Sequence, residues 1–67
     1  MDKEKIILAL GIVAGTVTAH EYWTDFIDTE RPRRDSNNES VFDYMHRLDR
    51  IVKVEVVKYL SEVLCTN

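Results

Sequence analysis

The sequence predicts an all-α protein, with two long helices that form an antiparallel hairpin and self-associate into a four-helix bundle. The single proline, Pro32, lies near the middle of the 67 residues, and neither glycine nor proline follows it. On both sides of Pro32, apolar residues recur at intervals of three and four, the spacing of one face of an α-helix. Matched helix lengths and one polar linker favour a hairpin.

The first helix is predicted over residues 2–28. Asp2 can cap its start, and Ile6, Leu10, Val13 and Val17 follow one another at spacings of four, three and four. Each of the two glycines in this segment costs about 1 kcal/mol of helix stability relative to alanine, so packing must stabilise the helix. Pro32 disfavours helical geometry at the preceding residue and ends the segment.

Residues 6–19 contain no charged side chain, and three structures can accommodate such a run. A transmembrane helix needs about 20 apolar residues, more than this run provides. A signal peptide needs a positive region before its apolar core, whereas Asp2 and Glu4 balance Lys3 and Lys5. The third structure, a helix buried on more than one side, is the one we predict.

Burial on two sides requires two neighbours, and one other helix of the same chain supplies only one. Gly11, Gly15 and Ala19 recur every four residues, and small residues at this spacing let a second helix approach closely. We therefore expect a homodimer. The residues predicted to mediate self-association are Gly11, Gly15, Ala19, Val52, Val56, Tyr59 and Val63.

Residues 29–40, "TERPRRDSNNES", are predicted to be a polar linker that is long for a helical hairpin. Arg31, Arg33 and Arg34 lie within it, and guanidinium groups form bidentate contacts with carboxylates or phosphates. The competing interpretation is local pairing with the acidic residues around them, Glu30, Asp35 and Glu39.

The second helix is predicted over residues 40–65. Ser40 with Asp43 matches a capping box, and so does Ser36 with Glu39, which leaves its start uncertain by one turn. A helical stripe of apolar residues supports this element: Val41, Met45, Leu48, Val52, Val56, Tyr59 and Val63. The alternative is a strand, because Val52, Val54 and Val56 alternate with charged residues; the longer helical match favours a helix.

Catalysis and metal binding receive little support from the sequence. In a hairpin, His20, Glu21 and Asp25 would lie near Asp43 and His46, which makes a carboxylate and histidine metal site the least favoured alternative. Cys65 has no histidine beside it and lies near the chain end. We predict a protein that is not an enzyme and that binds no metal or cofactor.

The charge distribution argues against nucleic-acid partners. The formal net charge is −3, and residues 1–29 carry two lysines against five acidic residues. DNA binding requires a basic surface that neutralises phosphates. A DNA-binding transcriptional regulator therefore remains only an alternative, as does a small membrane-associated peptide.

The function predicted from these observations is protein binding. Tyr22 and Trp23, together with the linker arginines Arg31, Arg33 and Arg34, are the candidate partner-binding residues, because Trp, Tyr and Arg dominate binding hot spots. We expect a cytoplasmic regulatory or inhibitory protein, of the kind that viruses use as accessory proteins, that covers the working surface of an unidentified protein target.

Overall fold

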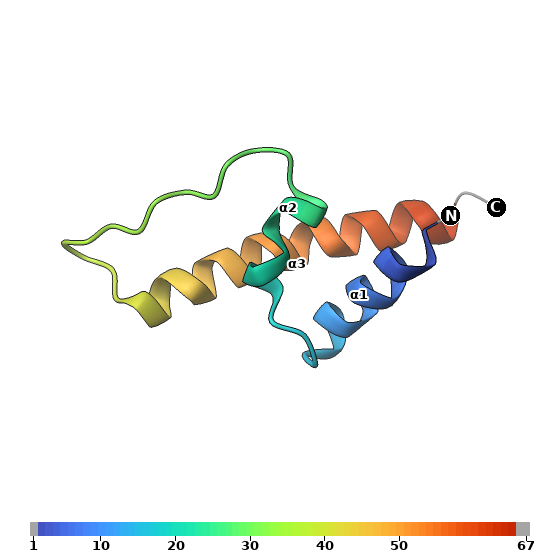
Figure 1. Cartoon of the computed structure of the whole chain (residues 1–67), viewed down its shortest axis with the longest axis horizontal. Coiled ribbons are helices and arrows are strands. Elements are labelled where there is room, and N and C mark those ends of the chain that lie inside the picture. The colour runs from blue at the N-terminus through green and yellow to red at the C-terminus, as the bar shows by residue number, and fades with distance from the viewer. Residues whose placement is uncertain (1, 66–67) are drawn as a thin grey trace.

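The computed structural model describes residues 2–65 and contains helices and no strand within that range. Four helical segments follow one another: α1 (Lys3–Ala14), the 3-10 turn η1 (Ala19–Tyr22), α2 (Trp23–Phe26) and α3 (Val41–Cys65) (Figure 1). The all-α prediction is confirmed, and the strand alternative for Val52 to Val56 is excluded because this segment lies inside α3.

The first half of the chain differs from the single helix predicted over residues 2–28. Asp2 caps α1 as expected, since its Oδ1 accepts a hydrogen bond from the backbone N–H of Lys5 at 3.1 Å. The helix then ends at Ala14, because Gly15 adopts a left-handed conformation with φ of 81°. Its N–H bonds to the carbonyls of Gly11 and Ile12, the usual way in which a terminal glycine closes a helix.

The chain reverses after Gly15, and η1 and α2 then pack beside α1 instead of continuing it (Figure 1). The physical reason lies in the amount of apolar surface that each arrangement buries. In one continuous helix, Ala19 and Trp23 would lie further along the same axis and could not pack against Ala9 and Ile12. The reversal brings these side chains into one core.

The second helix matches its prediction closely. α3 begins at Val41, and the Ser40 hydroxyl oxygen accepts a hydrogen bond from the Asp43 N–H at 3.1 Å, which is the N-terminal half of a capping box. The other candidate start, at Ser36, lies within a turn of the linker instead. At about 1.5 Å per residue, the 25 residues of α3 span about 37 Å.

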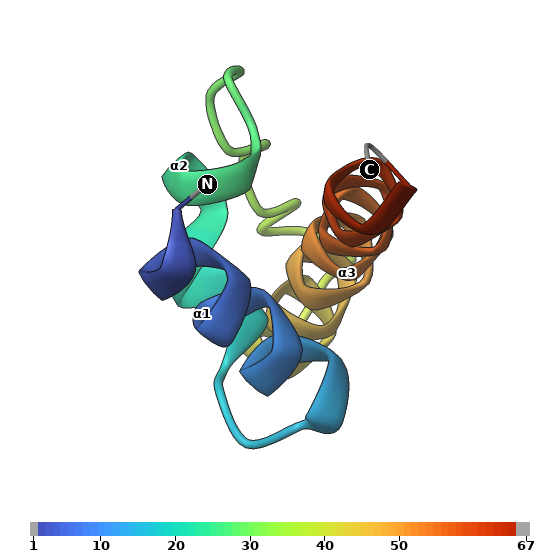
Figure 2. The ribbon, with the colours of Figure 1, turned by 90° about the vertical axis from the view of Figure 1, so that its right-hand side faces the viewer.

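The predicted hairpin of two long helices is replaced by one long helix that packs against shorter ones. Viewed along α3, α1 and α2 lie on the same side of it (Figure 2). The molecule is elongated, with principal extents of 47, 23 and 15 Å. The opposite side of α3 is therefore not covered by the chain's other helices.

The core is small and lies where α1, η1 and α2 meet the middle of α3. Leu48, Val52 and Val56 recur every four residues along α3 and are buried, as the helical stripe predicted. The other four buried side chains come from the first half of the chain: Ala9, Ile12, Ala19 and Trp23.

The uncharged run does not form a transmembrane helix. Within residues 2–65, none of the helices combines the length and the apolar character that crossing a bilayer requires.

Candidate protein-binding surfaces

The outward face of α1 exposes large apolar side chains. Ile7, Leu10 and Val13 follow one another at intervals of three, and their exposed fractions are 65%, 53% and 52%. α1 is apolar on its inner face as well, where Ala9 and Ile12 are fully buried. The sequence predicted apolar atoms on two faces of this helix, and the structure covers one of them.

Most of the residues predicted to mediate self-association instead make contacts within the chain. Ala19, Val52 and Val56 are buried in the core, so a second copy does not reach them without unfolding. Because the helix ends at Ala14, the expected stripe through Gly11, Gly15 and Ala19 does not form. A Cβ added at Gly11 would lie 2.7 Å from Val17 Cγ2, so this glycine makes room for the chain's own reversal.

The remaining two residues of that set, Tyr59 and Val63, are half-buried on α3. Tyr59 packs edge to face against Phe26 of α2, with ring centroids 5.7 Å apart. The Lys5 ammonium lies over both rings, 4.7 Å from the Tyr59 centroid and 5.4 Å from that of Phe26. This cluster joins α1, α2 and α3, and self-association through Tyr59 or Val63 stays a prediction.

His20 and Asp49 connect the reversed segment to α3. Asp49 Oδ1 accepts a hydrogen bond from the His20 backbone N–H at 2.7 Å and lies 2.9 Å from His20 Nδ1. Sequence reasoning grouped His20 with Glu21 and Asp25 and overlooked Asp49. Asp49 could have been identified from its position on α3, because it borders the buried stripe that contains Leu48 and Val52.

Trp23, predicted to contact a partner, is instead 4% exposed. Its indole Nε1–H donates to the Thr29 carbonyl oxygen at 2.6 Å, which attaches the start of the linker to α2. Tyr22 is half-buried against the same core. Of this aromatic pair, only Tyr22 retains surface that a partner can reach.

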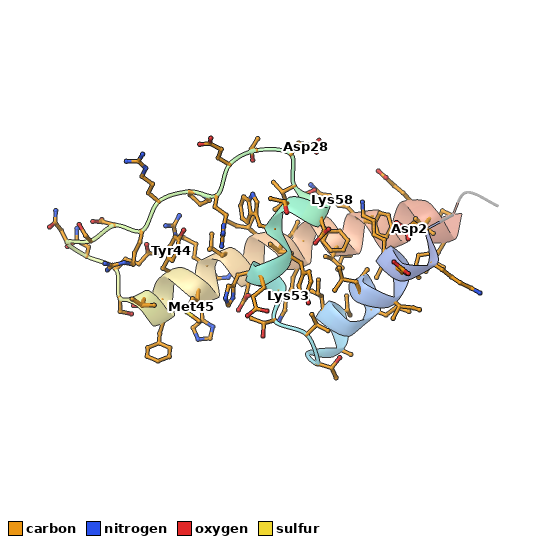
Figure 3. The ribbon with its side chains drawn as sticks, in the orientation of Figure 1. Asp2, Asp28, Tyr44, Met45, Lys53 and Lys58 are labelled. Carbon is orange, nitrogen blue, oxygen red and sulfur yellow. The ribbon has the colours of Figure 1, made fainter. Side chains whose placement is uncertain are left out.

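Residues 28–40 form an extended loop that runs along α3 and returns to its start (Figure 1). Two side chains of α3 hold this loop. The Tyr44 hydroxyl donates to the Pro32 carbonyl at 2.6 Å, and Arg47 Nη2 donates to the Arg33 carbonyl at 3.0 Å. Figure 3 labels Tyr44 at the start of α3, where the loop returns to the helix.

Glu39 provides the third attachment. Arg47 donates to both of its carboxylate oxygens, with Nε to Oε2 at 2.8 Å and Nη2 to Oε1 at 2.9 Å. Such bidentate pairs are among the stronger and more directional hydrogen bonds in proteins. The Asp35 N–H also donates to Glu39 Oε1, and Arg34 donates to the Glu39 backbone carbonyl, so the tip of the loop closes on itself.

This arrangement shifts the pKa values of both partners. The hydrogen bonds from Arg47 lower the pKa of the Glu39 carboxyl from its ordinary 4.5, against the opposing effect of desolvation. The same hydrogen bonds raise the pKa of the Arg47 guanidinium above its ordinary value. Both groups are therefore charged at neutral pH, and the contact is an ion pair there.

The three linker arginines differ in what they contact. Arg34 bonds to the Glu39 carbonyl, whereas the guanidinium groups of Arg31 and Arg33 make no hydrogen bond or ion pair with any residue in the range 2–65. Two of the acidic residues expected to neutralise them are engaged elsewhere. Glu39 pairs with Arg47, and Asp35 accepts from Asn37 N–H and Asn38 Nδ2.

The residues weighed for metal binding do not converge. No group of three or more His, Cys, Asp or Glu side chains within residues 2–65 is arranged to hold a metal ion. Cys65 is exposed at the end of α3. A shallow pocket at the start of α1 is lined by Asp2, Glu4, Lys5, Leu8 and Asp25.

Comparison with protein-family models, with curated proteins and with solved structures finds no match to this chain.

Proposed function

We propose that this chain is a non-enzymatic protein-binding protein that acts as a homodimer and regulates or inhibits a protein target by covering part of its surface. The observation that carries the proposal is the outward face of α1. Ile7, Leu10 and Val13 are each more than half exposed, and no charged residue interrupts the segment from Ile6 to Ala19.

The small core supports a dimer. Seven side chains are buried, and among the described residues neither a disulfide nor a metal cluster stabilises them. Chains of this size usually depend on such devices or on oligomerisation. A second copy placed against the outward face of α1 would remove these side chains from water, at about 25 cal/mol for each Å² of apolar area buried.

The dimer proposed here differs from the one expected from the sequence in the residues at its interface. The outward stripe of α1 replaces Ala19, Val52 and Val56, which the chain buries itself. Two copies of α1 across a twofold axis, each with its own α3 behind, would still form a bundle of four helices. In such a dimer, the loop with its arginines would remain available to a protein target. The proposed location is the cytoplasm, as predicted from the sequence.

Sedimentation equilibrium over a range of micromolar concentrations tests the proposal. We expect the wild-type chain to sediment as a dimer, and Leu10→Lys to sediment as a monomer because the lysine would bring charge into the interface. Phe42→Lys is the matched control, since Phe42 is equally apolar and 74% exposed but lies at the start of α3. A folded wild-type monomer at all concentrations would contradict the dimer.

A further inference from the structure

We propose that the loop of residues 28–40 is a preformed binding site for an acidic protein segment, whose carboxylates are bound by Arg31 and Arg33. This inference rests on the proposed function, because it assigns a chemical class to the protein partner.

The loop is fixed at several points although it contains no regular secondary structure. Thr29 is attached to α2 through Trp23, and Pro32 and Arg33 are attached to α3 through Tyr44 and Arg47. The backbone on both sides of Arg31 is therefore held. A loop ordered before binding loses less conformational entropy when it binds, which favours affinity.

Some charged side chains of the loop bond within the chain, and others are exposed to solvent. Glu39 is paired with the cationic Arg47, whereas Asp35 accepts hydrogen bonds from the neutral amides of Asn37 and Asn38 and keeps its negative charge. Glu30 is exposed and forms no ion pair within the described part of the chain, residues 2–65. The positive charges of Arg31 and Arg33 remain at the surface, on either side of a proline whose ring restricts the backbone.

Arginine side chains at such positions favour carboxylates. A guanidinium presents its donors in a planar fork that matches the two oxygens of a carboxylate. Nucleic acid is the less favoured partner, because its affinity comes from neutralising many phosphates and this chain carries a net charge of −3. An acidic protein segment fits a site that provides two arginines whose guanidinium groups form no hydrogen bond within residues 2–65.

The direct test measures binding of a fluorescein-labelled decaglutamate peptide to the full chain by fluorescence anisotropy. The double variant Arg31→Gln/Arg33→Gln should weaken binding by about tenfold or more. The control Lys3→Gln/Lys53→Gln removes the same number of positive charges from exposed positions on α1 and α3, and should change binding by less than about threefold. Equal losses in the two double variants would overturn the site.

A second variant separates a preformed site from attraction by net charge. Glu39→Gln removes a negative charge from the loop, so attraction by charge alone would tighten peptide binding. It also removes the carboxylate that Arg47 holds at both oxygens, so a preformed site should bind the peptide more weakly. Weaker binding supports the proposal, and unchanged or tighter binding contradicts it. Far-UV circular dichroism checks that the helices are retained.

Sedimentation of the same samples distinguishes this inference from the proposed dimer. The expected pattern of peptide binding in a protein that sediments as a monomer supports the arginine site and overturns only the dimer. A dimer that binds the peptide without depending on Arg31 and Arg33 overturns the site. Tighter binding of a single-stranded DNA oligomer of equal charge would overturn the choice of an acidic protein segment as partner.

Discussion

Trp23 combines two roles that sequence patterns cannot distinguish. Its side chain is buried as part of the core, and its Nε1–H donates to the Thr29 carbonyl at the start of the loop. A tryptophan near a chain reversal can equally be a surface anchor for a partner. The distinction depends on burial, which the surrounding elements decide together.

Replacing Trp23 with Phe tests the structural role of the indole. The variant removes the hydrogen bond to Thr29 and part of the buried volume, so we expect the free energy of unfolding to fall by about 1–2 kcal/mol. Urea denaturation followed by circular dichroism measures this change. Tyr22→Phe is the control, because the Tyr22 hydroxyl forms no hydrogen bond with any residue in the range 2–65, and its effect should stay within about 0.5 kcal/mol. Equal urea midpoints for the two variants would contradict the structural role of the Trp23 indole.

Asp49 should be more important for stability than its half-exposed position suggests. Asp49→Ala leaves the His20 backbone N–H and ring without their acceptor, and we expect it to cost about 1–3 kcal/mol of unfolding free energy. Asp49→Asn keeps an acceptor oxygen at the same place and should cost clearly less. The comparison is made by thermal and urea denaturation, and an asparagine variant as unstable as the alanine variant would indicate that charge, not the hydrogen bond, is what matters.

At the level of the elements, the end of α1 decides the path of the first half of the chain. The apolar spacing through Val17 predicted a helix that continued to residue 28, but Gly15 permits the left-handed turn that ends it at Ala14. The helical pattern and the glycine give opposite indications here. The reversal prevails because it lets η1 and α2 pack on α3 beside α1.

Gly15→Ala distinguishes a continuous helix from the observed reversal by the sign of its effect. In a continuous helix, alanine would add about 1 kcal/mol of stability. At φ of 81° it should instead remove about 1–2 kcal/mol, because a Cβ is disfavoured there. Gly15→Asn should cost less, since asparagine tolerates this conformation. Stabilisation by alanine, measured by urea denaturation, would contradict the reversal.

The attachment of Glu39 to Arg47 should be lost at acidic pH. The pKa of Glu39 is lowered by Arg47, so the stability that this pair contributes is fully present above the ordinary glutamate value and is lost as the pH falls through the lowered one. Arg47 stays charged throughout this range because its pKa is raised.

The Nε–H resonance of Arg47, followed by NMR during a pH titration, reports this detachment. We expect it to be protected from exchange near neutral pH and to shift as the carboxyl becomes protonated. Glu39→Gln should abolish the pH dependence over the same range. A titration curve that is identical in wild type and variant would assign the change to another group.

On the scale of the whole molecule, the elongated shape and the small core leave much apolar surface in water. Exposed large side chains occur on both α1 and α3: Ile7, Leu10, Val13, Val41, Phe42, Ile51, Val54, Val57 and Leu64. Only α1 carries such side chains in a segment that no charged residue interrupts, from Ile6 to the end of the helix at Ala14. This is why the dimer is assigned to α1 rather than to the open side of α3, where Arg50 and Lys53 lie between the apolar residues.

A dimer makes thermal stability depend on protein concentration. If association stabilises the fold, the midpoint of thermal unfolding should rise measurably with each tenfold increase in concentration. Differential scanning calorimetry provides the measurement, and Leu10→Lys should show no such dependence. A constant midpoint for wild type would argue for a chain that is stable alone.

The all-α class, the cap at Asp2 and the whole of α3 could be predicted from the sequence, because these features depend on residues within a few positions of one another. The residues that face the core along α3, Leu48, Val52 and Val56, follow from the same local spacing. The sequence also named the linker arginines Arg31, Arg33 and Arg34 as candidates, but it left open whether the neighbouring acidic residues pair with them.

Which apolar face is buried, and which linker arginines bond to the rest of the chain, depends on how the elements pack together. The reversal at Gly15 depends on how much surface η1 and α2 bury against α3, a comparison between alternative packings that no local pattern contains. Glu39 pairs with Arg47, eight residues away, and the Pro32 carbonyl accepts a hydrogen bond from Tyr44, twelve residues away. Such contacts exist only after the helix and the loop have been brought together.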